Sequence, residues 1–233
     1  MNSKPKVIAF DIFGTVVDWH GSIAAEVQRL KLPVDANKFA TAWREGYQPA
    51  MARVRSGELP WTKIDDLHRM ILDGILKDFA LTTLTESEKQ HLNLVWHRLN
   101  PWPDSVQGLT QLKSKFTIVT LSNGNLSLLA NMAKYGSLPW DLILSAEVFK
   151  HYKPDPETYL GVAHIFDLQP NEVMLAAAHK DDLLAAHQCG LQTAFIERPD
   201  EFGPGQIRQD LHQESFTNYH AKNIVDLATQ LGR

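Results

Sequence analysis

Side chains that can bind or react follow apolar stretches at four places in the chain. They are Asp11 with Thr15, Ser122 with Asn123, Lys153, and His179 with Asp182. An acid directly after a buried strand lies where open α/β sheets bind their ligands. A Ser–Asn turn offers a hydroxyl, an amide and backbone N–H groups, which suit an anion or a carboxylate. These residue types favour a site that binds an anion beside a carboxylate.

Each of these groups also fits an ordinary structural role. Asp11 suits a turn or a helix cap, S-N-G is a common turn sequence, and a single loop lysine such as Lys153 is usually solvated. Asp181 and Asp182 at a helix start can simply complement the helix dipole. The order of the groups is more specific, because an acid, a Ser or Thr, a Lys and a second acid each follow a predicted strand.

Five short apolar stretches, rich in β-branched and aromatic residues, predict buried strands. The first runs from residue 7 and stops at Asp11, and the others cover residues 116–122, 142–146, 173–178 and 193–197. Helical patterns alternate with them at 105–113, 130–135, 156–166 and 181–190, and Asn223 can cap a last helix. Alternating strands and helices imply a parallel sheet with right-handed crossovers. Residues 199–219 are polar and are predicted to be irregular.

Residues 37–98 show helical periodicity and no strand pattern. Phe39, Trp43 and Tyr47 fall on one stripe, and Asp35 and Thr85 suit helix N-caps. We therefore expect an all-helical insert between two parts of an α/β core. The core would cover residues 1–18 and 99–233, and the insert residues 19–98.

The composition excludes several classes of protein. The chain has 233 residues, of which 44% are hydrophobic, and a net charge of −4, so no basic field points to nucleic acid. The single cysteine, Cys189, excludes an internal disulfide and agrees with a reducing cytoplasm. No apolar run is long enough to cross a bilayer, and the N-terminus leads directly into a core strand without a signal peptide. We expect a cytoplasmic protein whose partners include neither nucleic acid nor membrane.

The stretch F-D-I-F-G-T at residues 10–15 resembles the first motif of the haloacid dehalogenase (HAD) superfamily, in which this aspartate is a nucleophile. The later groups at Ser122, Lys153 and Asp182 match the order of the other three motifs. The resemblance covers nearly the whole chain, and the helical block has the position of the family's cap domain. It implies a Rossmann-like α/β core with an inserted helical cap.

Phe13 indicates the branch of the superfamily. Phosphatases of this fold usually carry a second aspartate at this position, which protonates a departing alkoxide. A phenylalanine cannot do so, whereas a halide leaves as a weakly basic anion. The motifs D-x-F-G-T and L-S-N-G-N, with Lys153 six residues before Tyr159, resemble the type II L-2-haloacid dehalogenases. Arg44, in A-W-R-E-G-Y, matches the position of that family's cap arginine.

The resemblance implies a two-step reaction without a metal or other cofactor. Asp11 attacks the α-carbon of a 2-halocarboxylate, and water then hydrolyses the aspartyl ester to release a 2-hydroxy acid. Lys153 keeps Asp11 ionised, and Asp182 activates the water. Thr15 and His179 complete the expected catalytic set. The expected substrate- and halide-binding residues are Arg44, Ser122, Asn123, Phe13 and Tyr159.

The fourth motif departs from the family pattern. Family members often show S-S-N before the motif-four acid, and here Ala177, Ala178 and His179 occupy those positions before Asp182. His179 is a candidate base for the second step, or a hydrogen-bond donor to the leaving group. A packed histidine at a helix start is the structural alternative. The change bears on halogen preference, because a donor helps a poor leaving group such as fluoride.

Two other functions stay open from the sequence. One is a magnesium-dependent phosphatase of the same fold, in which Asp181 or Asp182 and the Phe13 carbonyl would bind the metal. The other is a non-enzymatic binding relative, which the joint presence of Asp11, Lys153 and Asp182 disfavours. Family relatives suggest a homodimer.

Overall fold

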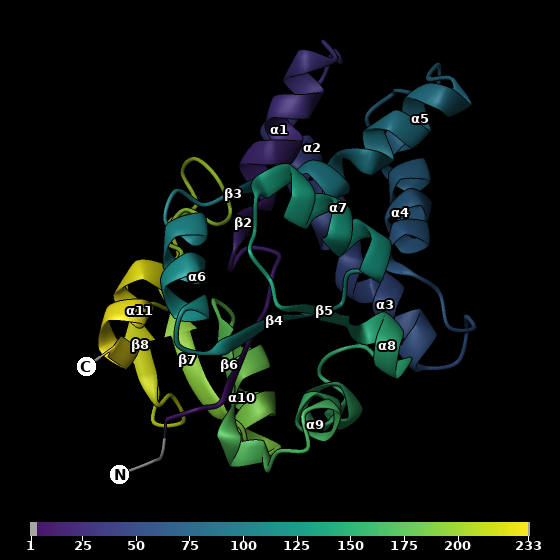
Figure 1. Cartoon of the computed structure of the whole chain (residues 1–233). Helices are drawn as coiled ribbons and strands as arrows, with labels where there is room; N and C mark the ends of the chain where they lie inside the picture. The colour runs from purple at the N-terminus through teal and green to yellow at the C-terminus, as the bar shows by residue number, and fades with distance from the viewer. Residues whose placement is uncertain (1–3, 233) are drawn as a thin grey trace.

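The computed structural model describes residues 4–232. A six-stranded parallel sheet in the order β5-β4-β1-β6-β7-β8 forms its centre (Figure 1). The strands are β1 (Val7–Phe10), β4 (Thr117–Ser122), β5 (Leu142–Ser145), β6 (Val173–Ala177), β7 (Gln192–Ile196) and β8 (Tyr219–Ala221). The predicted α/β fold with a parallel sheet is confirmed.

β1 is the strand that places the site. The chain passes from β1 to β4 and β5 on one side, then crosses to β6, β7 and β8 on the other. Phe10 is paired with Thr120 of β4 and with Ala176 of β6, so all three strands end at nearly the same level. Ligands of such sheets bind beyond the carboxyl ends of the strands where the order reverses. Asp11 follows β1 at this point.

Both faces of β1 are buried, which explains its continuous apolar sequence. Ile8 and Phe10 pack into one hydrophobic cluster, with Leu109 of α6 (Ser105–Lys113), Leu128 of α7 (Leu126–Gly136) and Leu227 of α11 (Ile224–Gly232). Val7 and Ala9 pack into the opposite cluster, with α9 (Pro156–Ile165) and α10 (Lys180–Gln188). Helices therefore cover both faces of the sheet.

The helical insert follows a short ladder of β2 (Val17–Asp18) with β3 (Asn100–Pro101), through which the chain leaves and re-enters the core. Sequence analysis did not predict this ladder, because strands of two residues have no periodicity. The insert contains α1 (Trp19–Arg29), α2 (Ala36–Glu45), α3 (Tyr47–Arg55), α4 (Ile64–Asp78), α5 (Glu86–Asn93) and the 3₁₀ turn η1 (Leu94–Arg98). Within this described block there is no strand, as expected. The exact division into two domains stays a prediction.

Local signals fixed several helix starts. The Asp35 carboxylate accepts the backbone N–H groups of Asn37 and Lys38, and Thr85 forms a capping box with Glu88. The Asn223 side chain accepts the N–H of Asp226 at the start of α11. The predicted N-caps at Asp35, Thr85 and Asn223 are therefore confirmed.

The last residues of the segment after β7 differ from the prediction. Residues 197–218 contain no regular element in the described structure, as expected, but Tyr219–Ala221 form β8 at the sheet edge. Three residues that are only partly apolar give too weak a pattern to predict a strand. Two further short helices, α8 (Ala146–Phe149) and η2 (Pro170–Glu172), were also not predicted.

None of the helices within residues 4–232 combines the length and the apolar character needed to cross a bilayer.

A buried ion pair joins elements that are distant in sequence. The Arg198 guanidinium, after β7, forms two hydrogen bonds of 2.8 and 2.9 Å to the Asp104 carboxylate, at the start of α6. Its Nε donates to the Thr15 carbonyl at 2.8 Å, and Asp104 also accepts the N–H of Ile224 at 2.8 Å. These bonds fix the loop that carries Thr15 against α6 and α11.

Replacing Arg198 by Ala should therefore destabilise the fold, because it leaves the Asp104 carboxylate largely buried without its cation. We expect the free energy of unfolding, measured by urea titration, to fall by about 3–5 kcal/mol. The matched control is Arg53→Ala, whose pair with Glu58 is solvent-exposed, and which should cost less than about 1 kcal/mol. Equal effects of the two variants would contradict this account.

Candidate active site

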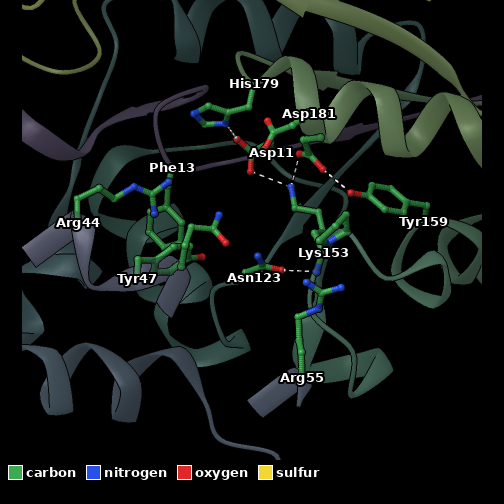
Figure 2. Close-up of a pocket in the computed structure, with 13 residues that line it drawn as sticks. Asp11, Phe13, Arg44, Tyr47, Arg55, Asn123, Lys153, Tyr159, His179 and Asp181 are labelled. Atoms are coloured by element: carbon green, nitrogen blue, oxygen red, sulfur yellow. Dashed lines mark hydrogen bonds and ion pairs between the residues drawn. The ribbon is translucent and has the colours of Figure 1, made fainter. Parts of the chain in front are cut away.

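A cavity of about 430 Å³ opens where β1 and β6 end, between the sheet and the helical insert (Figure 2). Asp11 and His179 lie at one side of it, Arg44 and Tyr47 at another, and Tyr159 lies opposite Arg44. The complete wall consists of Asp11, Phe13, Arg44, Tyr47, Gln48, Arg55, Asn123, Lys153, Pro154, Tyr159, His179, Asp181 and Asp182.

Asp11 is buried and accepts three hydrogen bonds through its carboxylate. Lys153 Nζ lies 2.9 Å from Oδ1, and Thr15 Oγ1 and His179 Nδ1 lie 2.8 and 3.1 Å from Oδ2. Burial raises the pKa of this carboxyl, but Lys153 and His179 outweigh burial and hold the pKa far below its usual range. Asp11 is therefore a carboxylate at neutral pH, as a nucleophile must be.

Thr15 lies behind Asp11, in a turn that begins with Gly14. The φ angle of Gly14 is +84°, which favours glycine, and its N–H donates to the Val17 carbonyl at 3.0 Å. The Thr15 hydroxyl accepts the N–H of Ala178 at 2.8 Å. Its own proton is thereby directed to Oδ2 of Asp11. The turn makes Thr15 a fixed donor to Asp11, and its catalytic role stays a prediction.

Lys153 joins the two acids of the predicted catalytic set. Its Nζ lies 2.5 Å from Asp182 Oδ2, in addition to the bond to Asp11, and the Tyr159 hydroxyl donates to Asp182 Oδ1 at 2.6 Å. Burial lowers the pKa of Lys153, but the two carboxylates outweigh this and raise it, so the ammonium keeps its charge. Burial raises the pKa of Asp182 above its usual value. The two acids thus differ in proton affinity, as a nucleophile and a base would.

Of the Ser–Asn pair, Asn123 lines the cavity, whereas Ser122 is buried outside the set of lining residues. The Ser122 hydroxyl accepts the N–H of Gly124 at 3.1 Å, which closes the turn. The side-chain Oδ1 of Asn123 accepts the backbone N–H of Lys153 at 2.8 Å. Asn123 therefore helps to place the lysine, and a direct role of Ser122 in substrate binding stays a prediction.

Arg44 extends from the insert toward the cavity and packs on aromatic rings. Its guanidinium carbon lies 4.3 Å from the centre of the Tyr47 ring and 5.6 Å from that of Trp19. Its Nη1 is buried and has no hydrogen-bond partner among the described residues. Phe13 lines the same cavity and packs edge-on against Tyr47 and Trp96. An unpaired buried donor of a cationic side chain is suited to bind an anion.

His179 forms hydrogen bonds through both ring nitrogens, each to a carboxylate. Nδ1 lies 3.1 Å from Asp11 Oδ2, and Nε2 lies 2.7 Å from Glu201 Oε1. Burial lowers the pKa of His179, but Glu201 and Asp11 outweigh burial and raise it to about 10. At neutral pH His179 is therefore an imidazolium that donates to both carboxylates.

Sequence analysis did not identify Glu201, nor Arg208, which donates to Glu201 Oε2 at 2.8 Å. Both lie in the polar segment after β7, where no local pattern marks a functional residue. The available signal was the position of this segment, because a loop that leaves a parallel strand begins at the same sheet edge as the site. Gln48 and Arg55, which also line the cavity, were missed because they lie on an ordinary helical surface.

In the part of the chain that the structure describes, no group of three or more His, Cys, Asp or Glu side chains is arranged to hold a metal ion.

The family model for haloacid dehalogenase-like hydrolases matches residues 5–190 of this chain. The chain therefore belongs to this family of hydrolases, as the sequence motifs indicated.

Two solved structures are similar over almost the full length. L-2-haloacid dehalogenase PA0810 is 44% identical with a TM-score of 0.92, covering 98% of this chain and 100% of that one. The defluorinating L-2-haloacid dehalogenase Rha0230 is 46% identical with a TM-score of 0.93, covering 98% and 96%. (S)-2-haloacid dehalogenase 1 of Pseudomonas sp. (strain CBS-3) is 28% identical over 220 residues, which cover 88% of this chain and 92% of that protein.

Replacing Lys153 by Met should lower the free energy of unfolding, and the loss should be larger at pH 7 than near pH 4. In the wild type, the lowered pKa of Asp11 stabilises the fold above the unfolded-state value of 3.8, and this contribution disappears as the pH falls. Without the ammonium, the pKa of Asp11 rises, so the variant loses stability as the pH increases from 4 to 7. We expect a deficit of about 3–5 kcal/mol at pH 7 and a smaller one near pH 4.

Urea unfolding of the Lys153→Met protein between pH 4 and 8 measures this deficit. Lys63→Met is the control, because Lys63 is half-exposed where it pairs with Glu147. A deficit of the same size at every pH would contradict the assignment of Lys153 as the cation shared by the two acids.

Proposed function

We propose that this protein hydrolyses short 2-haloalkanoic acids to 2-hydroxy acids through an ester intermediate on Asp11. One observation carries the proposal: the Asp11 carboxylate, kept ionised by Lys153, lies in a cavity with Phe13 and Arg44. No proton donor occupies position 13, so the site suits a leaving group that departs as a weakly basic anion without a proton. The similarity to L-2-haloacid dehalogenases over nearly the full chain supports the same reaction.

In the first step, a carboxylate oxygen of Asp11 attacks the α-carbon opposite the carbon–halogen bond. A C–O bond forms, the carbon–halogen bond breaks with its electron pair, and the configuration inverts. Arg44 is our candidate to bind the departing halide, and its unpaired Nη1 supports this role. Asn123, on the cavity wall, is the candidate to bind the substrate carboxylate.

In the second step, water attacks Cγ of Asp11 while Asp182 accepts its proton. The raised pKa of Asp182 suits this role. The bond between Cγ and the ester oxygen then breaks, and the alkoxide takes the proton from Asp182 and leaves as the 2-hydroxy acid. Asp11 is restored with one solvent oxygen, and the net products are the hydroxy acid, a halide ion and a proton.

We include 2-fluoro acids among the proposed substrates. The chain is 46% identical to Rha0230, a defluorinating L-2-haloacid dehalogenase. The hydrogen bonds of His179 limit how it can assist. Both ring nitrogens are held by Asp11 and Glu201, so neither is free in this state to act on water or on fluoride. Arg44 is therefore the better candidate donor to a departing fluoride. Assembly as a homodimer and a cytoplasmic location stay predictions.

Asp11→Asn should abolish turnover, because the amide is a poor nucleophile at carbon. Halide release is measured for chloro-, bromo- and fluoroacetate and for both enantiomers of 2-chloropropionate, with a chelator present. We expect the wild type to consume the (S)-enantiomer and to yield the (R)-2-hydroxy acid. After one turnover in labelled water, mass spectrometry should find the heavy oxygen in Asp11.

Three results would point elsewhere. Full activity of the Asp11→Asn protein would exclude Asp11 as the nucleophile. Phosphate release that needs magnesium and is lost with a chelator would identify a phosphatase. Release of neither halide nor phosphate would favour a binding protein without activity.

Arg44→Met should slow halide release more than the replacement of any other insert residue that lines the cavity. The side chain keeps an unbranched apolar stem but loses the unpaired donor, and we expect kcat to fall about 100-fold or more. Arg55→Met is the matched control, because Arg55 lines the same cavity but is half-exposed and paired with Asp155. An equal loss in both variants would indicate that only the overall positive charge of the cavity matters.

A further inference from the structure

We propose that Glu201 is a positioning residue that keeps His179 protonated, so that His179 serves as a fixed hydrogen-bond donor to Oδ2 of Asp11 during ester hydrolysis. The inference rests on the proposed function for its role in catalysis. It assigns a function to a residue outside all four sequence motifs, 22 positions after the histidine that it contacts.

The carboxylate of Glu201 is completely buried and surrounded by donors. His179 Nε2 lies 2.7 Å and Trp19 Nε1 3.3 Å from Oε1, and Arg208 Nη1 lies 2.8 Å from Oε2. Burial raises the pKa of Glu201, but the charges of His179 and Arg208 outweigh burial and lower it. Glu201 is thus a fixed anion on the side of the imidazole that faces away from Asp11.

Among the groups that pair directly with one another around Asp11 and Glu201, the charges balance when His179 is protonated. Three buried carboxylates, those of Asp11, Asp182 and Glu201, face three cationic groups. The cationic groups are Lys153, Arg208 and the imidazolium of His179. A neutral histidine would leave one negative charge in excess among these directly paired groups, with only the more distant Arg44 guanidinium to offset it, which is unfavourable. Asp210, which pairs with Arg208, is half-exposed and is balanced by solvent as well.

Glu201 occupies the space that a side chain at Gly14 would fill. A Cβ atom on Gly14 would lie 2.1 Å from Oε1 and 2.6 Å from Cδ of Glu201. The glutamate therefore packs directly against the turn between Asp11 and Thr15. Arg208 also donates to the Ala178 carbonyl at 2.8 Å, which ties the same loop to the strand end before His179. The loop after β7 is thus fitted to the catalytic turn at two points.

The hydrogen bonds distinguish the two oxygens of Asp11. Oδ2 accepts from Thr15 and His179, whereas Oδ1 accepts from Lys153. Oδ1 keeps a free lone pair and becomes the ester oxygen in the first step. Oδ2 then becomes the carbonyl oxygen, and its negative charge grows when water adds to Cγ. The Thr15 hydroxyl and the His179 imidazolium are two fixed donors to this charge, which is the arrangement of an oxyanion hole.

The charged groups around His179 have opposing effects on the protonation of its ring. Asp11, Asp182 and Glu201 favour the imidazolium, while Lys153 and the more distant Arg44 and Arg208 oppose it. The pair with Glu201 is the shortest contact of the ring. Glu201→Gln keeps the shape and a hydrogen-bond partner but removes the charge, so the pKa of His179 should fall.

The first test measures His179 in the substrate-free enzyme by nitrogen NMR of the ring, from pH 5 to 10. In the wild type both ring nitrogens should stay protonated through pH 8, and in Glu201→Gln the proton should be lost at a pH lower by at least two and a half units. A neutral His179 in the wild type at pH 7 would overturn the inference without any variant. An unchanged titration in Glu201→Gln would also overturn it.

The second test measures ester hydrolysis as a function of pH. Glu201→Gln should be close to the wild type near pH 6 and roughly tenfold slower at pH 8.5, because a donor is lost only when His179 deprotonates. Asp210→Asn, which removes a partner of Arg208 without touching His179, should keep the wild-type profile. In a His179→Asn background, Glu201→Gln should no longer shift the profile.

A loss of rate in Glu201→Gln that is equal at every pH would indicate a merely structural role and would overturn the inference. The NMR result needs no turnover. If no substrate releases halide while His179 titrates as expected, the proposed function fails and the pairing with Glu201 stands.

Discussion

The shared ammonium of Lys153 is the interaction on which the rest of this site depends. Two carboxylates, Asp11 and Asp182, are buried within hydrogen-bond distance of one amine. Removing three charges from water costs several kcal/mol for each ion, and the fold compensates only through close pairing and complete hydrogen bonding. Asn123 fixes the backbone of the lysine, and Tyr159 binds the remaining oxygen of Asp182. The unequal donors leave Asp11 ionised and make Asp182 the more basic of the two.

A second layer of charge completes the site from the opposite side. His179 lies between Asp11 and Glu201, and Arg208 neutralises the outer carboxylate. This layer comes from a loop without regular structure, yet its side chains are buried and paired. Because the cationic ring donates to one oxygen of Asp11 and Lys153 to the other, the two oxygens of the nucleophile are not equivalent. That difference allows one oxygen to attack and the other to hold negative charge.

The helical insert supplies the apolar half of the cavity. Tyr47 and Trp96 of the insert pack edge-on against Phe13, which follows β1, and the guanidinium of Arg44 lies over the Tyr47 ring. Electrostatic interactions in such surroundings are stronger than in water. The polar groups at the strand ends and an aromatic wall that carries the unpaired Nη1 of Arg44 together suit a small acid that carries a halogen.

The sequence by itself determined five of the six strands of the sheet, the helical insert and the four polar groups that begin with Asp11, because apolar periodicity is local and parallel strands end at a common edge. Asp11, Thr15, Lys153 and Asp182 accordingly meet where their motifs predicted. Only the tertiary structure decided that Asn123 rather than Ser122 faces the cavity, and that both nitrogens of His179 are occupied. The position of Glu201 was likewise decided only by the tertiary structure. Its place depends on the packing of a polar loop against the space at Gly14, and no local pattern records a contact of that kind.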